Sequence, residues 1–157
     1  FDPWFLEAPV PPEEIEQLRE VAMQSGQQIA VGEEWRTAYD ARLRLERGAC
    51  HIVQPEMGHT GITEFVRICR CAAEREVAVI PHATIGSGIF LAASLQVSAA
   101  MEPVTGHEFQ HSILEPFRHF MKPELNCEQG TYRIPAADGI GVRPSPEMRA
   151  AMTRIPA

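Results

Sequence analysis

The chain lacks the features that mark nucleic-acid-binding and membrane proteins. Its basic residues are scattered, with 14 Lys and Arg against 21 Asp and Glu and a formal net charge of -7. That balance argues against nucleic acid or an anionic membrane as a partner. No apolar run approaches the roughly 18 residues that cross a bilayer, and no basic-then-apolar signal opens the chain. We therefore expect a soluble protein with no nucleic-acid and no membrane partner.

Cysteine is also scarce, and its spacing does not indicate a metal site. Cys69 and Cys71 stand two residues apart in a segment with helical periodicity, so their side chains point in different directions and are unsuited to sharing a metal. We expect reduced, structural cysteines, which fits a cytoplasmic protein. The chain begins at Phe1, without an initiator Met and almost inside a predicted strand. We expect it to be a fragment.

What the chain does contain is a repeated unit. A short apolar run ends in a polar residue, a Gly- and Pro-rich loop follows, and a segment with helical spacing comes next, which is typical of βα units. The polar residues recur roughly every 25 positions, a length that accommodates a strand, a helix and two loops. The runs are "WFLE", "QIAVGE", "HIVQPE", "VAVIPH" and "TGHEF", and their ionisable ends are Glu7, Glu33, Glu56, His82 and Glu108.

The segments between these runs have the apolar stripes of helices packed on a sheet. The segment 89–101 is apolar nearly all round, so we expect it to be the most buried helix. The predicted strands are apolar on both faces, which favours a parallel sheet covered on both sides. The first stripe consists of Ile15, Leu18, Val21 and Ala22, and the second consists of Ile62, Phe65, Val66, Cys69, Ala72 and Ala73.

Two architectures fit successive βα units: an open doubly wound sheet and a closed (β/α)8 barrel. In a barrel, catalytic groups from the C-terminal ends of several strands converge over one mouth. Because all five runs end in an ionisable residue, the barrel is favoured. A barrel takes about 250 residues, so five units form only part of one. We predict an α/β fold with a partial TIM-type barrel over residues 1–125 and a C-terminal tail over 126–157.

The ionisable ends suggest both a metal site and a proton-transfer site. Glu7 and Glu33 would suit Mg2+, which prefers carboxylate oxygens. His82 could act as a general base if the Glu56 carboxylate orients its imidazole, and Glu108 would lie on the far side. We interpret the other histidines as surface or structural residues. These are His51, His59, His107, His111 and His119, and His59 is the strongest exception because its loop would border the barrel mouth.

Five segments, in their order and spacing, give the chain a specific resemblance to a known family. They are "WFLEAP", "IAVGEEW", "GACHIVQPEMGHTGITE", "VIPHATIGSGIFLAASL" and "GHEFQ". Together they resemble the C-terminal part of the catalytic barrel of the enolase superfamily, closest to its mandelate racemase subgroup. The resemblance covers nearly the whole chain. It implies strands 4 to 8 of a (β/α)7β barrel, followed by a tail that packs towards a capping domain.

The resemblance also implies a chemistry. Glu7 and Glu33 would be two of three Mg2+ ligands, and His82 would remove the proton alpha to the substrate carboxylate or assist loss of a hydroxyl. Glu108 would hydrogen-bond the developing enediolate. Glu56 stands where the family usually has Asp. The implied substrate is a small-molecule carboxylate, an acid sugar, and the implied enzyme is a homo-oligomeric dehydratase, with racemase or cycloisomerase as alternatives.

A second hypothesis concerns the chain by itself. The resemblance implies that the first metal-ligand strand, a strand that carries a catalytic Lys in many members and the capping domain all lie outside these 157 residues. The open edges of a partial barrel present unpaired N–H and C=O groups. The alternative is therefore a catalytically inactive half-barrel that self-associates.

Overall fold

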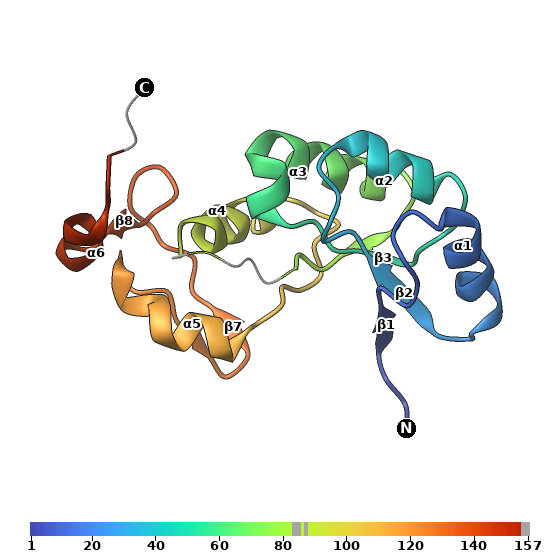
Figure 1. Cartoon of the computed structure of the whole chain (residues 1–157), viewed down its shortest axis with the longest axis horizontal. Helices are drawn as coiled ribbons and strands as arrows, with labels where there is room; N and C mark the ends of the chain where they lie inside the picture. The colour runs from blue at the N-terminus through green and yellow to red at the C-terminus, as the bar shows by residue number, and fades with distance from the viewer. Residues whose placement is uncertain (83–85, 87, 155–157) are drawn as a thin grey trace.

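Parallel βα units form the first part of the molecule, as the repeat predicts. The computed structural model describes residues 1–82, 86 and 88–154. The strands β1 to β4 pair in parallel in the order in which they occur, and α1, α2 and α3 lie along one side of them (Figure 1). The strands are β1 (Phe5–Glu7), β2 (Gln28–Val31), β3 (Ile52–Val53) and β4 (Ala78–Val79), and the helices are α1 (Ile15–Gln24), α2 (Ala38–Leu45), α3 (Met57–Ala73) and α4 (Ile89–Ser98).

The fifth predicted strand, "TGHEF", is not a strand in the structure. The neighbouring Val104 forms one isolated parallel bridge with Val79, and Thr105 N donates to Val79 O at 3.0 Å. The segment therefore lies beside β4, where a fifth strand would be, but regular pairing does not continue. Pro103 lacks an N–H and Gly106 has no side chain to pack, and both residue types weaken a strand.

The main core lies between the sheet and the helices. Ile29 and Ala30 are adjacent in β2 and both are fully buried, which confirms that this strand is covered on both faces. The central part of α4 is buried from Leu91 to Leu95, in agreement with the prediction for segment 89–101. Phe65 and Ile68 of α3 contribute large side chains to the same core as Ile29.

Helix α3 departs from the predicted stripe at its start. Gly61 has φ 61° and ψ 175°, which interrupts the helix and separates the turn at 57–60 from the regular helix that follows. Ile62, directly after this break, is half exposed rather than buried. Its predicted place on the packed face was therefore wrong, because the regular apolar spacing begins only further along the helix.

The remaining chain packs on α4. The Gln96 side chain of α4 donates to Pro135 O at 2.6 Å. A second core cluster joins Leu91 and Leu95 to residues of the later segments, including Met121 and Val142. These segments are α5 (His111–Phe117), the 3-10 turn η1 (Arg118–Phe120), β5 (Met121–Lys122), β6 (Cys127–Glu128), β7 (Thr131–Tyr132), β8 (Arg143–Pro144) and α6 (Pro146–Ala151), with β5 pairing β8 and β6 pairing β7, both antiparallel.

The pairing of β5 with β8 crosses the expected boundary between residues 125 and 126. Helices α1 and α6 lie at opposite ends of the long axis (Figure 1). That residues 126–157 pack towards a capping domain stays a prediction.

Two expectations about the whole chain can be compared with the structure directly. All four cysteines are free thiols, and burial raises the pKa of Cys50 and of Cys69 to about 12, as structural cysteines require. Among the described residues, no helix has both the length and the apolar composition needed to cross a membrane.

Candidate active site

Parallel strand pairing brings the predicted site residues to one edge of the sheet. Glu7 ends β1 and lies opposite Ala30 of β2, while Glu33, Glu56 and His82 each follow the end of a later strand. Gly32, directly after β2, permits the backbone there to approach the residue that follows β3. Its φ is 134°, and a Cβ built there would lie 3.0 Å from Gln54 N.

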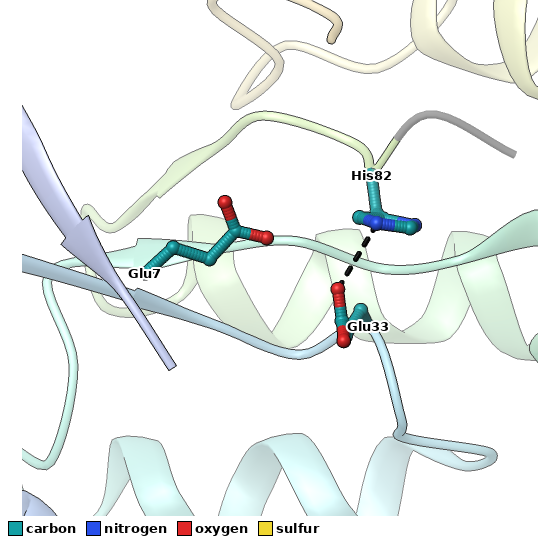
Figure 2. Close-up of side chains that lie close together, drawn as sticks. All are labelled: Glu7, Glu33 and His82. Atoms are coloured by element: carbon teal, nitrogen blue, oxygen red, sulfur yellow. Dashed lines mark ion pairs between the residues drawn. The ribbon is translucent and has the colours of Figure 1, made fainter. Parts of the chain in front are cut away.

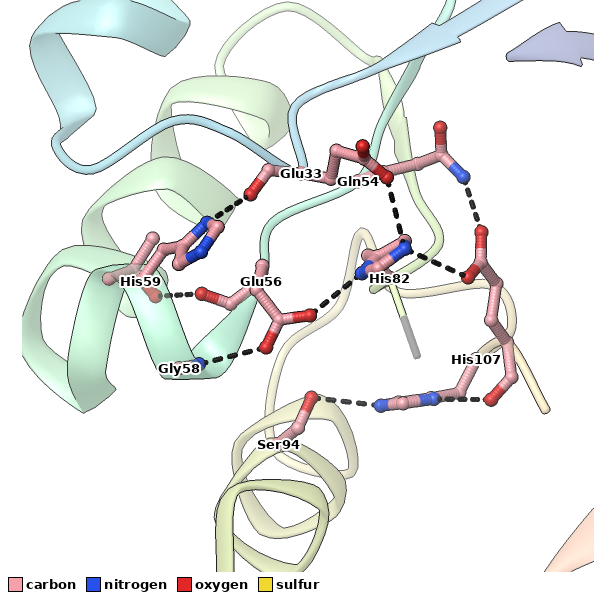
Figure 3. Close-up of polar contacts among 10 residues, drawn as sticks. Glu33, Gln54, Glu56, Gly58, His59, His82, Ser94 and His107 are labelled. Carbon is pink, nitrogen blue, oxygen red and sulfur yellow. Dashed lines mark hydrogen bonds and ion pairs between the residues drawn. The ribbon is translucent and has the colours of Figure 1, made fainter. Parts of the chain in front are cut away.

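His82 lies at the centre of the cluster, between the carboxylates of Glu33 and Glu56, which follow strands, and of Glu108, which follows the bridge at Val104. Its Nδ1 is 2.7 Å from Glu56 Oε2, and its Nε2 is 3.0 Å from Glu33 Oε2 and 4.0 Å from Glu108 Oε2 (Figure 3). The hydrogen bond to Glu56 is the main cause that raises the pKa of His82, and the negative charges around it act in the same direction, while burial opposes them. The imidazole is thus oriented at Nδ1 and presents Nε2 to the carboxylate cluster.

Glu56 is held on both of its oxygens. It is only 5% exposed, and its Oε1 accepts a hydrogen bond from Gly58 N at 3.0 Å, which caps the first turn of α3. Its Oε2 is the atom that contacts His82. Glu therefore places a carboxylate against the imidazole even though it is one methylene longer than Asp.

Glu7, Glu33 and His82 form the cluster that could hold a cation (Figure 2). One ligand atom from each lies within 4.8 Å of the others. Burial raises the pKa of Glu7, and the nearby charges of Glu108 and Glu33 raise it further. A divalent cation would offset this repulsion. Mg2+ prefers oxygen ligands, so the two carboxylates fit it, while the imidazole is better suited to moving a proton.

Glu108 belongs to the same cluster, and Gln54 positions it. Gln54 Nε2 donates to Glu108 Oε1 at 2.6 Å, and a hydrogen bond from the same side chain partly opposes the rise in the pKa of Glu7 that burial causes. We did not predict Gln54 from the sequence. The available signal was a polar residue inside the apolar run "HIVQPE", where a buried amide needs a partner.

Two further histidines lie close to the site. His107 is half-buried and bonded at both nitrogens, to Ser94 Oγ at 2.8 Å and to Glu108 O at 2.9 Å (Figure 3), as expected of a structural histidine. His59 contacts Glu33 O through Nδ1 at 2.7 Å. It lines a pocket together with Glu33, Glu34, Glu56, Gly58, His82 and Phe90. The small-residue loop predicted after His82 lies largely outside the described residues.

The arrangement is that of a partial (β/α) barrel, because successive parallel strands end in ionisable groups that meet at one mouth. Comparison with known families agrees. The family model for the enolase C-terminal domain-like group matches residues 1–148. The chain therefore belongs to the enolase superfamily, among its mandelate racemase and muconate lactonizing enzyme relatives.

Individual relatives match closely over most of this chain. It is 34% identical over 151 residues to a D-galactonate dehydratase of Ralstonia pickettii, covering 90% of this chain and 39% of the relative. It is 32% identical to a D-galactarolactone cycloisomerase of Agrobacterium fabrum, covering 88% of this chain and 39% of the relative. A crystal structure of an enolase superfamily member from Agrobacterium tumefaciens superposes with a TM-score of 0.94 at 54% identity, covering 98% of this chain and 40% of that one. The chain thus spans about two fifths of the length of these proteins.

Proposed function

We propose that the chain forms the proton-transfer part of a Mg2+-dependent enzyme that acts on an acid sugar. In this proposal the enzyme removes the proton alpha to the substrate carboxylate and then expels a hydroxyl group as water, the reaction of a dehydratase. The observation that carries the proposal is the position of His82, which is fixed by buried Glu56 at 2.7 Å and faces Glu33 at 3.0 Å. A general base needs a carboxylate that orients the imidazole and a second ring nitrogen that faces the substrate site.

Each side chain has a distinct task in this scheme. His82 accepts the substrate proton at Nε2, and the Glu56 carboxylate stabilises the imidazolium that results, consistent with its effect on the pKa of His82. The same nitrogen can return the proton to a departing hydroxyl group. We assign Glu108, whose Oε1 accepts from Gln54 Nε2 at 2.6 Å, to donate a hydrogen bond from its carboxyl O–H to the oxygen on which negative charge develops, a role that requires the acid form of the side chain.

Glu7 and Glu33 are the residues that we propose hold Mg2+. Their carboxylates match the oxygen preference of this ion, and burial, followed by repulsion from Glu108 and Glu33, raises the pKa of Glu7. When bound, Mg2+ supplies positive charge that stabilises a developing anion on a carboxylate. The names of two relatives, a dehydratase and a cycloisomerase, support an acid sugar or its lactone as the substrate.

The metal assignment can be tested on the chain alone. We expect Mg2+ to bind in a calorimetric titration, and binding should be lost in Glu33→Gln and in Glu7→Gln. Glu74→Gln is a matched control because this carboxylate is exposed and pairs with Arg75. Retention of the heat signal in both site variants would show that the ion binds elsewhere.

The proton-transfer assignment is tested in the whole enzyme. We expect His82→Ala to abolish turnover of the acid-sugar substrate and exchange of its alpha proton with solvent deuterium. Turnover at the wild-type rate would remove His82 from the mechanism. Product analysis separates a dehydratase, which releases water and forms a 2-keto acid, from a racemase or a cycloisomerase, which gives an isomer.

For the whole enzyme we propose a homo-oligomer, and for the chain by itself we propose self-association through its exposed strand edge. Within the described chain β1 pairs only with β2, and Trp4 beside it is 66% exposed. Such an edge can pair with another chain. Light scattering of the purified chain tests this, and a monomer at all concentrations would contradict self-association.

A further inference from the structure

His59 has one side-chain nitrogen hydrogen-bonded to the protein, and its side chain lines the pocket described above. Its Nδ1 lies 2.7 Å from Glu33 O (Figure 3). A carbonyl oxygen can only accept, so Nδ1 carries the proton and donates this bond. In the neutral ring, Nε2 then carries a lone pair and is an acceptor. Within the described part of the chain, no hydrogen bond to this Nε2 is found.

The pocket that His59 lines has walls of different character. Glu33, Glu56 and His82 form its ionisable side, and Phe90 forms an apolar side. The Phe90 ring lies against the turn that carries His59, because a Cβ built on Gly58 would be 3.1 Å from Phe90 Cδ2. A polyhydroxylated chain presents C–H groups to an aromatic wall and O–H groups to an acceptor. The two walls of this pocket therefore suit such a chain.

We propose that His59 is a specificity-determining residue whose Nε2 accepts a hydrogen bond from a substrate hydroxyl group, one remote from the carbon that loses its proton. This inference rests on the function proposed above and deepens it by naming the recognised chemistry. The site selects sugar acids with hydroxyl groups along the chain over 2-hydroxy acids with a plain alkyl chain.

Two substitutions separate recognition by His59 from a purely structural role. In His59→Asn, the amide nitrogen takes the place of Nδ1 and can still donate to Glu33 O, but nothing replaces Nε2. In His59→Gln, the longer amide reaches the place of Nε2 and offers an oxygen to the pocket, while the bond to Glu33 O is lost. A structural role predicts that Gln is the more damaging variant, and a recognition role predicts that Asn is.

The experiment is an NMR titration of the chain in excess Mg2+ with two probes, D-galactonate and 2-hydroxyhexanoate. Both are six-carbon 2-hydroxy acids, and only the first has hydroxyl groups at C3 to C6. One neutral hydrogen bond contributes about 0.5–1.5 kcal/mol, or roughly a 2- to 13-fold change in affinity. We expect wild-type chain to prefer D-galactonate by about this factor, His59→Gln to keep a preference, and His59→Asn to bind both acids equally.

The outcomes distinguish failure of this inference from failure of the proposed function. If His59→Asn keeps the full wild-type preference, or if the wild-type chain shows none while binding both acids, His59 does not read a hydroxyl group. The proposed function then still stands. If neither acid binds the wild-type chain in the presence of Mg2+, the same titration of the whole enzyme decides between the two proposals. Absence of binding there as well refutes the acid-sugar site, and the role of His59 with it.

Discussion

The contact between Glu56 and His82 makes the stability of the chain depend on pH in a direction that can be measured. The pKa of His82 is raised above 6.5, first by its hydrogen bond to Glu56. Protonated His82 therefore stabilises the fold fully below the unfolded pKa, and this stabilisation is lost as the pH rises through the folded pKa. We expect Glu56→Gln to remove the part that comes from the carboxylate charge.

The size of the effect follows from the two bonds that Glu56 makes. Its oxygens contact His82 Nδ1 at 2.7 Å and Gly58 N at 3.0 Å, and an amide has only one accepting oxygen for both donors. The free energy lost because one of these two donors has no acceptor is independent of pH. A hydrogen bond to a charged group contributes about 1 kcal/mol more than a neutral one. The free energy of unfolding should therefore fall further at about pH 5.5 than at about pH 9, by an additional ~1 kcal/mol.

Urea unfolding followed by circular dichroism at both pH values measures this difference. The matched control is Glu74→Gln, whose carboxylate is exposed and pairs with Arg75, and we expect it to change stability by the same small amount at each pH. If Glu56→Gln lost the same free energy at both pH values, the carboxylate charge would not be coupled to protonation of His82. The orienting role of Glu56 would then be refuted.

Three further predictions concern the packing of the chain. Gly141→Ala should destabilise the fold by about 1–3 kcal/mol more than Gly139→Ala, because both glycines have positive φ but a Cβ at 141 would lie 2.6 Å from a carbonyl oxygen while position 139 is open; equal midpoints in urea would disprove this. Cys127, half-buried, should react with a thiol reagent before buried Cys50, whose pKa is about 12, and mass spectrometry gives the order. Burial lowers the pKa of His107, so neutral His107 stabilises the fold above about pH 6.5, and this stabilisation is lost as the pH falls through the folded pKa. His107→Gln should remove this loss of stability at low pH, and a variant with the wild-type pH profile of stability would contradict the prediction.

The period of the sequence was sufficient to predict the repeated βα units because strand ends and helices recur at similar spacing. Glu7, Glu33, Glu56 and His82 could be placed at one edge since parallel strands carry their C-terminal ends to the same side. Their roles as ligands or proton carriers stay predictions. The fold and the gathering of these side chains were therefore accessible without coordinates.

Other features depend on contacts between distant segments. Gln54 was missed because its amide acquires meaning only beside Glu108, which is far along the chain. The segment after Pro103 looked like a strand, but whether a short apolar run forms regular pairing depends on its neighbour. The exposure of Ile62 depends on the backbone angles at Gly61. The sequence alone does not show whether a glycine within a helical pattern interrupts the helix.

The break at Gly61 divides α3 into two parts with different roles. The regular helix after it supplies Phe65 and other core residues, so its sequence is constrained by packing. Gly58 and His59 before it are exposed beside the pocket, and no atom lies within 4 Å of a Cβ built on Gly61. The exposed His59 side chain can therefore be exchanged without repacking the helix, whereas Gly58 is confined by Phe90 and Glu56. In the proposed role of His59, this single position is where substrate preference can be rewritten, in evolution or by design, while the scaffold stays the same.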